Sequence, residues 1–213
     1  KVGISHRHNR LQEDVSFIQE LPLLDYAGRY LTNYDIPGVF LENKWTESKF
    51  TLLTGVRLDH FGSFGWKVTP RLLVRAELSP DTDIRFSIGK GYRIAHIFAE
   101  NANLLASNRI LRLSNELAPE EAINTGLNFV QTFHWNEINI TLSGDAYLTF
   151  FQNQIFPDFD KEVNTAIVDN FFGQSVSGSF QLENKWIFSP QFDVKVAYNY
   201  LEVYRKVEGV RQD

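Results

Sequence analysis

The chain has 213 residues, enough for one large all-β domain or for two small domains. It contains no cysteine, which excludes disulfides, thiolate metal sites and cysteine nucleophiles, and its net charge of -5 argues against nucleic-acid binding. No run approaches the ~18 consecutive apolar residues of a membrane-spanning helix. A membrane-spanning β-barrel remains compatible with the composition, because only every second residue of its strands faces lipid.

Apolar and polar residues alternate with a period of two along much of the chain, which is typical of strands with one apolar face. Between residues 137 and 150, Ile138, Ile140 and Leu142 alternate with Asn139 and Thr141. We predict nine strands, in chain order at residues 1–8, 39–45, 50–60, 68–78, 84–92, 123–133, 137–150, 176–188 and 192–200.

The connections between these strands are of two kinds. Short turns are expected near residues 46–49, 79–83, 134–136 and 189–191, and long or irregular connections at 9–37, 61–67, 94–119 and 157–164. A soluble sandwich shows the same alternation, but here the strands commonly reach about ten residues, whereas globular strands average about five or six. Short turns at one end, long loops at the other and aromatic residues beside the turns favour an outer-membrane barrel; these aromatic residues are Trp45, Phe50, Phe133, Trp135, Trp186, Phe188 and Phe192.

A longer motif begins in the fifth predicted strand. It reads Gly89, Lys90, Gly91, Tyr92 and Arg93, then a polar loop, then Asn115, Leu117, Pro119, Glu120 and Gly126. This order and spacing resemble the late barrel strands of the TonB-dependent outer-membrane receptors. The resemblance covers roughly the chain from Ile36 onward, through segments such as PGVFLENKW, LLTGVRLDHF and INITLSGDAYLTFFQNQI.

The resemblance implies an all-β fold: an antiparallel meander of about nine long amphipathic strands that forms part of a transmembrane barrel of about 22 strands. Residues 1–213 would then be a fragment of one barrel domain, without the plug domain, the box that engages TonB, or the closing strands. It implies active uptake of a ferric siderophore, haem or cobalamin across the outer membrane. The implied partners are the TonB energy-transducing protein, a small-molecule or metal-chelate ligand and outer-membrane lipid, with no nucleic acid.

The candidate ligand-binding residues lie in two predicted loops. In the family, outer loops and the plug apex form the binding site, and the loop between residues 93 and 119 offers Arg93, His96, Glu100, Asn101, Asn103, Asn108, Arg109 and Arg112. The connection between residues 9 and 36 offers Asp14, Tyr26, Arg29, Tyr30, Tyr34 and Asp35. By the same resemblance, the strand residues that would point inward toward the plug are Arg57, Arg71, Arg75 and Arg85.

Enzymatic and metal chemistry have little support in the sequence. His6 and His8 share one face of a strand, but no third ligand stands at a compelling spacing. A phosphate-binding loop requires a helix directly after its glycines, and no helix is predicted after Gly89 and Gly91. We therefore expect no catalytic residue, metal or cofactor. Two alternatives to the receptor remain: a passive porin or outer-membrane adhesin, and a soluble β-sandwich that binds carbohydrate.

Overall fold

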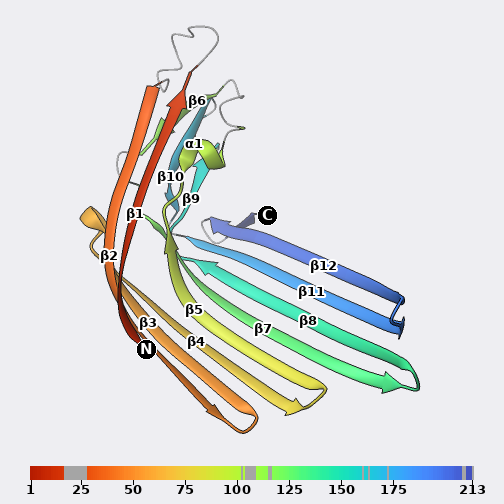
Figure 1. Ribbon diagram of the computed structural model, residues 1–213. Coiled ribbons are helices and arrows are strands. Elements are labelled where there is room, and N and C mark those ends of the chain that lie inside the picture. The colour runs from red at the N-terminus through yellow and green to blue at the C-terminus, as the bar shows by residue number, and fades with distance from the viewer. Residues whose placement is uncertain are drawn as a thin grey trace.

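The computed structural model describes residues 1–16, 28–101, 103, 109–114, 117–159, 161–162, 164–171, 173–207 and 210–212. Ten of the described strands form one antiparallel sheet in the order β1-β2-β3-β4-β5-β7-β8-β11-β12-β13 (Figure 1). Their bounds are β1 Val2–Val15, β2 Gly28–Glu47, β3 Phe50–His60, β4 Trp66–Ser79, β5 Thr82–Arg93, β7 Glu120–Trp135, β8 Ile138–Phe151, β11 Gln174–Ser189, β12 Phe192–Val207 and β13 Val210–Gln212. All nine predicted strands are confirmed, in the predicted order, and β13 is an addition.

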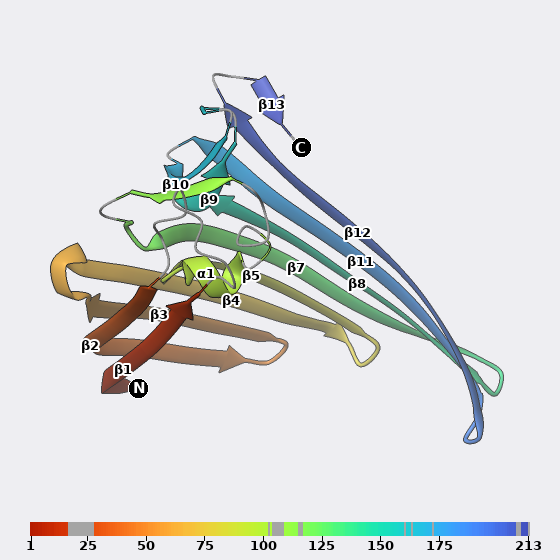
Figure 2. The same cartoon turned by 90° about the horizontal axis from the view of Figure 1, so that it is seen from above.

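A smaller sheet and two short helices lie at one end of the long strands. The small sheet consists of β6 Ile110–Leu113, β10 Thr165–Phe171 and β9 Gln154–Asp158, with β10 parallel to β6 and antiparallel to β9. Helix α1 spans Ile97–Glu100, and a 3-10 turn, η1, spans Gly62–Phe64. None of the described helices is long and apolar enough to cross a membrane. Figures 1 and 2 place α1 and the small sheet at the end opposite the tight turns.

The strand register gives the large sheet two chemically different faces. One row of directly opposed residues crosses eight strands and is apolar or aromatic throughout: Trp45, Leu52, Val74, Phe86, Leu127, Ala146, Phe180 and Tyr200. The neighbouring row is polar throughout: Thr46, Thr51, Arg75, Arg85, Asn128, Asp145, Gln181 and Asn199. Because adjacent residues of a strand point to opposite sides, these rows define an apolar outer face and a polar inner face.

The outer face has the dimensions of a membrane belt. On β7 its mainly apolar stretch runs from Ile123 to Trp135, and Leu127 and Trp135 are 50% and 67% exposed. At ~3.4 Å per residue and a tilt of ~45°, this stretch measures ~29 Å along the membrane normal, close to the thickness of the hydrocarbon core. So large an exposed apolar surface is unusual on a soluble monomer and marks contact with lipid.

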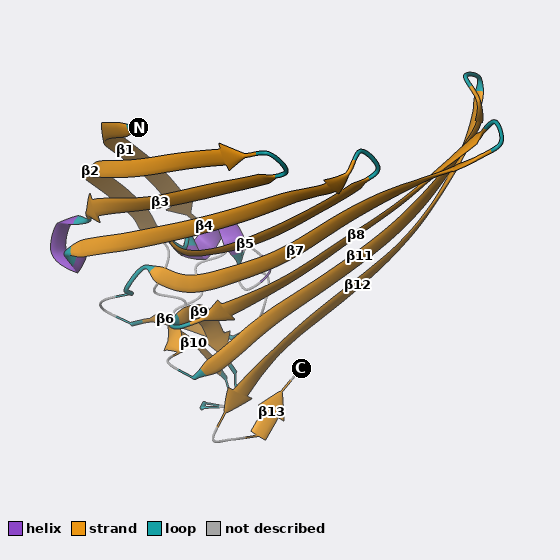
Figure 3. Ribbon diagram, turned by 90° about the horizontal axis from the view of Figure 1, so that it is seen from below, coloured by secondary structure: helices purple, strands orange, loops and turns teal. Residues whose placement is uncertain are grey.

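The two ends of the sheet differ in their connections, as predicted. Two-residue turns join β2 to β3, β4 to β5, β7 to β8 and β11 to β12, and Figure 3 shows them at the same end, which we call the turn end. The predicted aromatic residues lie beside these turns, and Trp45, Phe50, Trp135 and Phe192 are about half exposed or more. The opposite end, the loop end, carries α1, η1 and the small sheet.

The predicted connection at residues 9–37 is wrong over most of its length. Strand β1 continues to Val15 and β2 begins at Gly28, and the two pair along this whole stretch. Beyond the belt neither face contacts lipid, so both carry polar residues and the alternation that reveals a strand disappears. Pro37 pairs with β1 alone, because pairing with β3 starts at Gly38, and proline is tolerated at such an edge. The predicted loop at 94–119 likewise contains α1 and β6, and the one at 157–164 contains the end of β9.

Strand β5 separates from β4 near the loop end. The two strands pair up to Arg71 and Gly89, whereas β5 stays paired with β7 to Arg93. Side chains bridge the gap: the Tyr92 hydroxyl donates to Asp59 Oδ2 at 2.8 Å, and Lys67 Nζ lies 2.7 Å from Glu121 Oε1. We call this set of contacts the seam.

Candidate functional site

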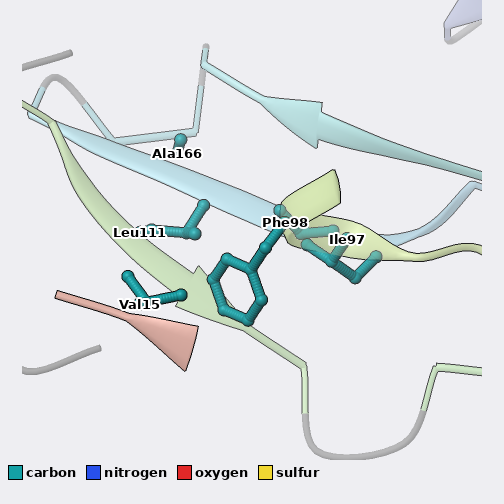
Figure 4. Close-up of a cluster of buried hydrophobic side chains, with 6 residues drawn as sticks. Val15, Ile97, Phe98, Leu111 and Ala166 are labelled. Carbon is teal, nitrogen blue, oxygen red and sulfur yellow. The ribbon is translucent and has the colours of Figure 1, made fainter. Parts of the chain in front are cut away.

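A small hydrophobic core holds the loop-end elements together. Val15, Ile97, Phe98, Leu111, Ala166 and Val168 are all buried, and they come from β1, α1, β6 and β10. Figure 4 shows the ring of Phe98 beside Val15 and Leu111. The apolar residues of these short elements therefore position α1 over the inner face of the β1–β2 hairpin.

A cavity of about 570 Å³ lies next to this core, within the size range of small-molecule sites. We call it the loop-end cavity. Register and alternation place Glu13, Tyr30, Thr32 and Tyr34 on the inner face of β1 and β2, where they form one wall. The remaining lining residues come from η1 and its flank, from the segment around α1, from the end of β6, from the segment before β7 and from β9: Phe61, Ser63, Phe64, Ile94, Ala95, Ile97, Phe98, Leu113, Ser114, Leu117, Ala118, Pro119 and Ile155.

Aromatic rings form much of the cavity wall. The Tyr30 and Phe98 rings have centroids 4.4 Å apart, and the Tyr34 ring meets Phe61 edge-on at 4.9 Å. Phe61 also stacks on Phe64 at 5.1 Å. Burial raises the pKa of Tyr34, while a hydrogen bond with Thr32 opposes the shift, so the phenol stays protonated at neutral pH. The wall can thus contact apolar or aromatic groups and donate hydrogen bonds from hydroxyls.

The motif residues Arg93 and Glu120 are paired with one another. They are register partners on β5 and β7, and the Arg93 guanidinium donates to Glu120 and lies 2.9 Å from Glu100 of α1. The Glu120 side chain is only 2% exposed, and its Oε1 accepts a 2.7 Å hydrogen bond from the Ile155 amide. The Arg93–Glu120 pair therefore connects the two ends of the loop that follows β5, and it also contacts β9 and α1.

Two asparagines hold the segment before β7. Asn153 donates to the Pro119 carbonyl at 2.8 Å and accepts from the Glu121 amide at 2.7 Å. Asn170 of β10 accepts from the Ala118 amide at 2.8 Å and donates to the Ala118 carbonyl at 3.0 Å. The backbone that follows the long loop is therefore held by one side chain from the turn after β8 and one from β10.

The other candidates of the 93–119 loop do not gather into one site. Asn101 donates back to the Ile97 carbonyl at 2.9 Å, and Asn103 is exposed. Arg112 lies 2.9 Å from Glu162, and the Arg109 guanidinium lies 4.8 Å from the Phe159 ring centroid. His96 precedes α1, its amide donating to Glu100 at 3.0 Å. Asn108 and Tyr26 lie outside the described residues.

The candidates of the 9–36 connection separate by face. Tyr30 and Tyr34 line the loop-end cavity, whereas Asp14, Arg29 and Asp35 lie on the outer face, beyond the belt. Asp14 pairs with Arg29 at 2.8 Å. Asp35 lies 3.2 Å from His6 and 3.0 Å from His8. Within the described part of the chain, no group of three or more His, Cys, Asp or Glu residues could hold a metal ion.

The four arginines expected to point inward share the inner face. Arg75 and Arg85 are register partners, and Arg71 opposes Gly55, which is two residues from Arg57 on β3. Each has a carboxylate partner in this chain: Arg57 with Asp59, Arg71 with Glu42, Arg75 with Glu77 and Asp83, and Arg85 with Asp83. Their charge on the inner face is therefore largely balanced.

Several cavity residues were not among the sequence candidates. Glu13 lies within the segment predicted as a loop, and its register pairing with Tyr30 becomes visible only once the β1–β2 strands are extended. Phe61, Phe64 and Phe98 are aromatic residues in irregular segments far from the turn end. Their position away from the turns could have identified them as candidates, because aromatic side chains in polar loops are frequently buried or contact ligands.

Comparison with known proteins gives one family match. A family model described as "TonB dependent receptor-like, beta-barrel" matches residues 4–212. No curated protein matches the chain.

Solved structures similar to the chain include receptors and transporters. The ferric enterobactin receptor PfeA of Pseudomonas aeruginosa aligns with a TM-score of 0.67 at 15% identity over 94% of this chain and 33% of that one. The iron transporter FrpB of Neisseria meningitidis gives 0.60 at 14% identity, over 83% and 27%. The outer membrane transporter YddB of Escherichia coli gives 0.54 at 13% identity, over 96% and 29%. The chain thus spans about a third of the receptors it matches, and at these identities the likeness concerns the fold.

Proposed function

The chain belongs to the TonB-dependent receptor β-barrel family, and we propose that it forms the ligand-receiving wall of a receptor that actively takes up a scarce nutrient across the outer membrane. The nutrient is a ferric siderophore, haem or cobalamin. The observation that carries this proposal is the loop-end cavity, which opens on the inner face of a wall whose outer face is suited to lipid. The family and its solved relatives are transport receptors rather than enzymes.

The two ends of the sheet give the proposal a direction. Outer-membrane barrels carry short turns on the periplasmic side and longer loops outside. The loop-end cavity would then face the medium and receive the ligand first. In this proposal Tyr30 and Tyr34 contact the ligand directly, and the other loop-end residues form the rim or hold the loops in place: Arg93, His96, Glu100, Asn101, Asn103, Arg109 and Arg112.

The inner face of the sheet supports the second part of the proposal, that uptake is active and involves a plug domain. Ionic side chains in a water-lined lumen are tolerated, whereas in lipid each would cost ~2–4 kcal/mol at mid-bilayer. We assign Arg57, Arg71, Arg75 and Arg85 to contact with a plug domain elsewhere in the receptor. Movement of such a plug by TonB would link the inner-membrane proton gradient to passage of the ligand.

Growth of a deletion strain tests the proposal. The strain is supplied with ferric siderophores, haem or cobalamin as the limiting source, alongside the parent and the strain carrying the full-length gene. We expect a growth defect on at least one source that the gene restores, and an equal defect when TonB is removed. Normal growth on every source would refute it, and TonB-independent uptake would indicate a passive porin instead.

A further inference from the structure

The described lining of the loop-end cavity carries little charge. Seventeen of the described residues line it, and among these Glu13 is the only one with a carboxylate, ammonium or guanidinium group. Its Oε1 accepts a 2.9 Å hydrogen bond from the Ala99 amide, and its side chain is half-buried. No lysine, arginine or histidine of the described part of the chain lines the cavity.

Two arginines that adjoin lining residues in the chain have carboxylate partners. Arg93 is held by Glu120 and Glu100, and Arg112 lies against Glu162. A polyanion in the cavity would lose hydration, meet the Glu13 carboxylate and gain no compensating positive charge. Aromatic walls have the opposite preference, since the faces of Tyr and Phe rings attract cations and apolar groups.

We propose that the loop-end cavity selects by charge, receiving a neutral or singly positive ferric chelate with aliphatic or aromatic arms, of the trihydroxamate type, and rejecting polyanionic tris-catecholate chelates. The inference rests on the proposed uptake function and specifies its substrate class. The Tyr30, Tyr34 and Thr32 hydroxyls would donate to the chelate's carbonyl oxygens, the rings would pack on its arms, and Glu13 would attract a positive group.

The test compares two probes on the purified full-length receptor in detergent. One is ferric desferrioxamine B, a singly positive trihydroxamate, and the other is a ferric tris-catecholate with three negative charges. Binding is followed by calorimetry. We expect the trihydroxamate to bind at least about ten-fold more tightly, the difference that a lost charge pairing of ~1.4 kcal/mol produces. Equal or tighter binding of the tris-catecholate, or binding of neither probe, would overturn the inference.

Matched variants identify the cavity as the source of the preference. Glu13→Gln keeps an oxygen that can accept from the Ala99 amide and removes the charge, so it should lower trihydroxamate affinity by about 3- to 10-fold. Asp14→Asn removes an acid from the next residue, on the outer face, and should leave affinity unchanged. An equal effect of both variants, or no effect of Glu13→Gln, would contradict the assignment. A deletion strain that loses only tris-catecholate uptake would leave the proposed transport intact while overturning this inference.

Discussion

The Tyr92 hydroxyl donates a 2.8 Å hydrogen bond to Asp59 Oδ2 across the gap where β4 and β5 have ceased to pair. Asp59 is 1% exposed, and the single N–H of Arg57 Nε also donates to its carboxylate, with both oxygens at 2.8 Å from Nε. Burial, followed by the hydrogen bond and charge of Asp59, raises the pKa of Tyr92 to about 12. The tyrosine of the Gly-x-Gly-Tyr-Arg motif therefore serves the barrel wall: a side-chain contact continues the wall where backbone hydrogen bonds end.

We expect Tyr92→Phe to destabilise the receptor. A hydrogen bond to a charged, buried acceptor contributes ~1.5–3 kcal/mol, and because Arg57 still satisfies Asp59, the loss should fall near the lower value. The measurement is the denaturant midpoint of the full-length receptor refolded into lipid vesicles. Tyr198→Phe, on the exposed outer face of β12, is the control and should change the midpoint little. A Tyr92→Phe midpoint equal to that of the parent would show that the seam contact is dispensable.

Gly38 is needed because the Asp59 side chain occupies its space. The two residues are register partners, and a Cβ added to Gly38 would overlap Asp59 Oδ1. Gly38→Ala should displace the carboxylate from Arg57 and Tyr92 and cost ~3 kcal/mol, as breaking a buried ionic pair does. Gly28→Ala, where nothing lies within 4 Å of the added Cβ, is the matched control on the same strand. Comparable midpoints for the two variants would refute this account.

The wall could be predicted from the sequence because lipid imposes a period of two on every strand that crosses it, as at Ile138, Ile140 and Leu142. The site could not, since Glu13 and Tyr30 lie beyond the belt, where both faces are polar and the period vanishes. Contacts between segments distant in sequence could not be predicted either. Strands β6 and β10 pair through only four residue pairs, too few to give a recognisable pattern. The motif predicted the order of Arg93 and Glu120 along the chain. That the two are opposite one another on β5 and β7 is known only from the strand register.

Adjacent residues of β11 test the assignment of the two faces. Phe180 belongs to the apolar row and Gln181 to the polar row, beside Asp145. Phe180→Arg should destabilise the barrel by ~2–4 kcal/mol, the cost of arginine on the lipid face near mid-bilayer. Gln181→Arg should cost little, because it adds a cation next to a carboxylate on the inner face. Unfolding midpoints in lipid vesicles give both values, and a reversed order would invert the two faces.

The second contact of the seam, between Lys67 and Glu121, should contribute less to stability at acidic pH. Burial raises the pKa of Glu121, but the hydrogen bonds from Lys67 at 2.7 Å and from Lys90, whose Nζ lies 2.6 Å from Oε2, outweigh it, so the net shift is downward. A carboxyl whose folded pKa lies below its unfolded value of about 4.5 stabilises the fold above that pH and loses its effect as pH falls through the folded pKa.

Glu121→Gln should therefore lower stability at neutral pH and flatten its decline on acidification below pH ~4.5, where the parent loses the same contribution. The denaturant midpoint of the full-length receptor, measured at a series of pH values, reveals the difference between the two proteins. Exposed Glu77, which pairs with Arg75 near the turn end, provides the control: Glu77→Gln should leave the pH profile close to that of the parent, because exposed pairs contribute little. If the midpoints of Glu121→Gln and of the parent declined in parallel through this pH range, the contacts of Glu121 with Lys67 and Lys90 would not contribute to the stability of the seam.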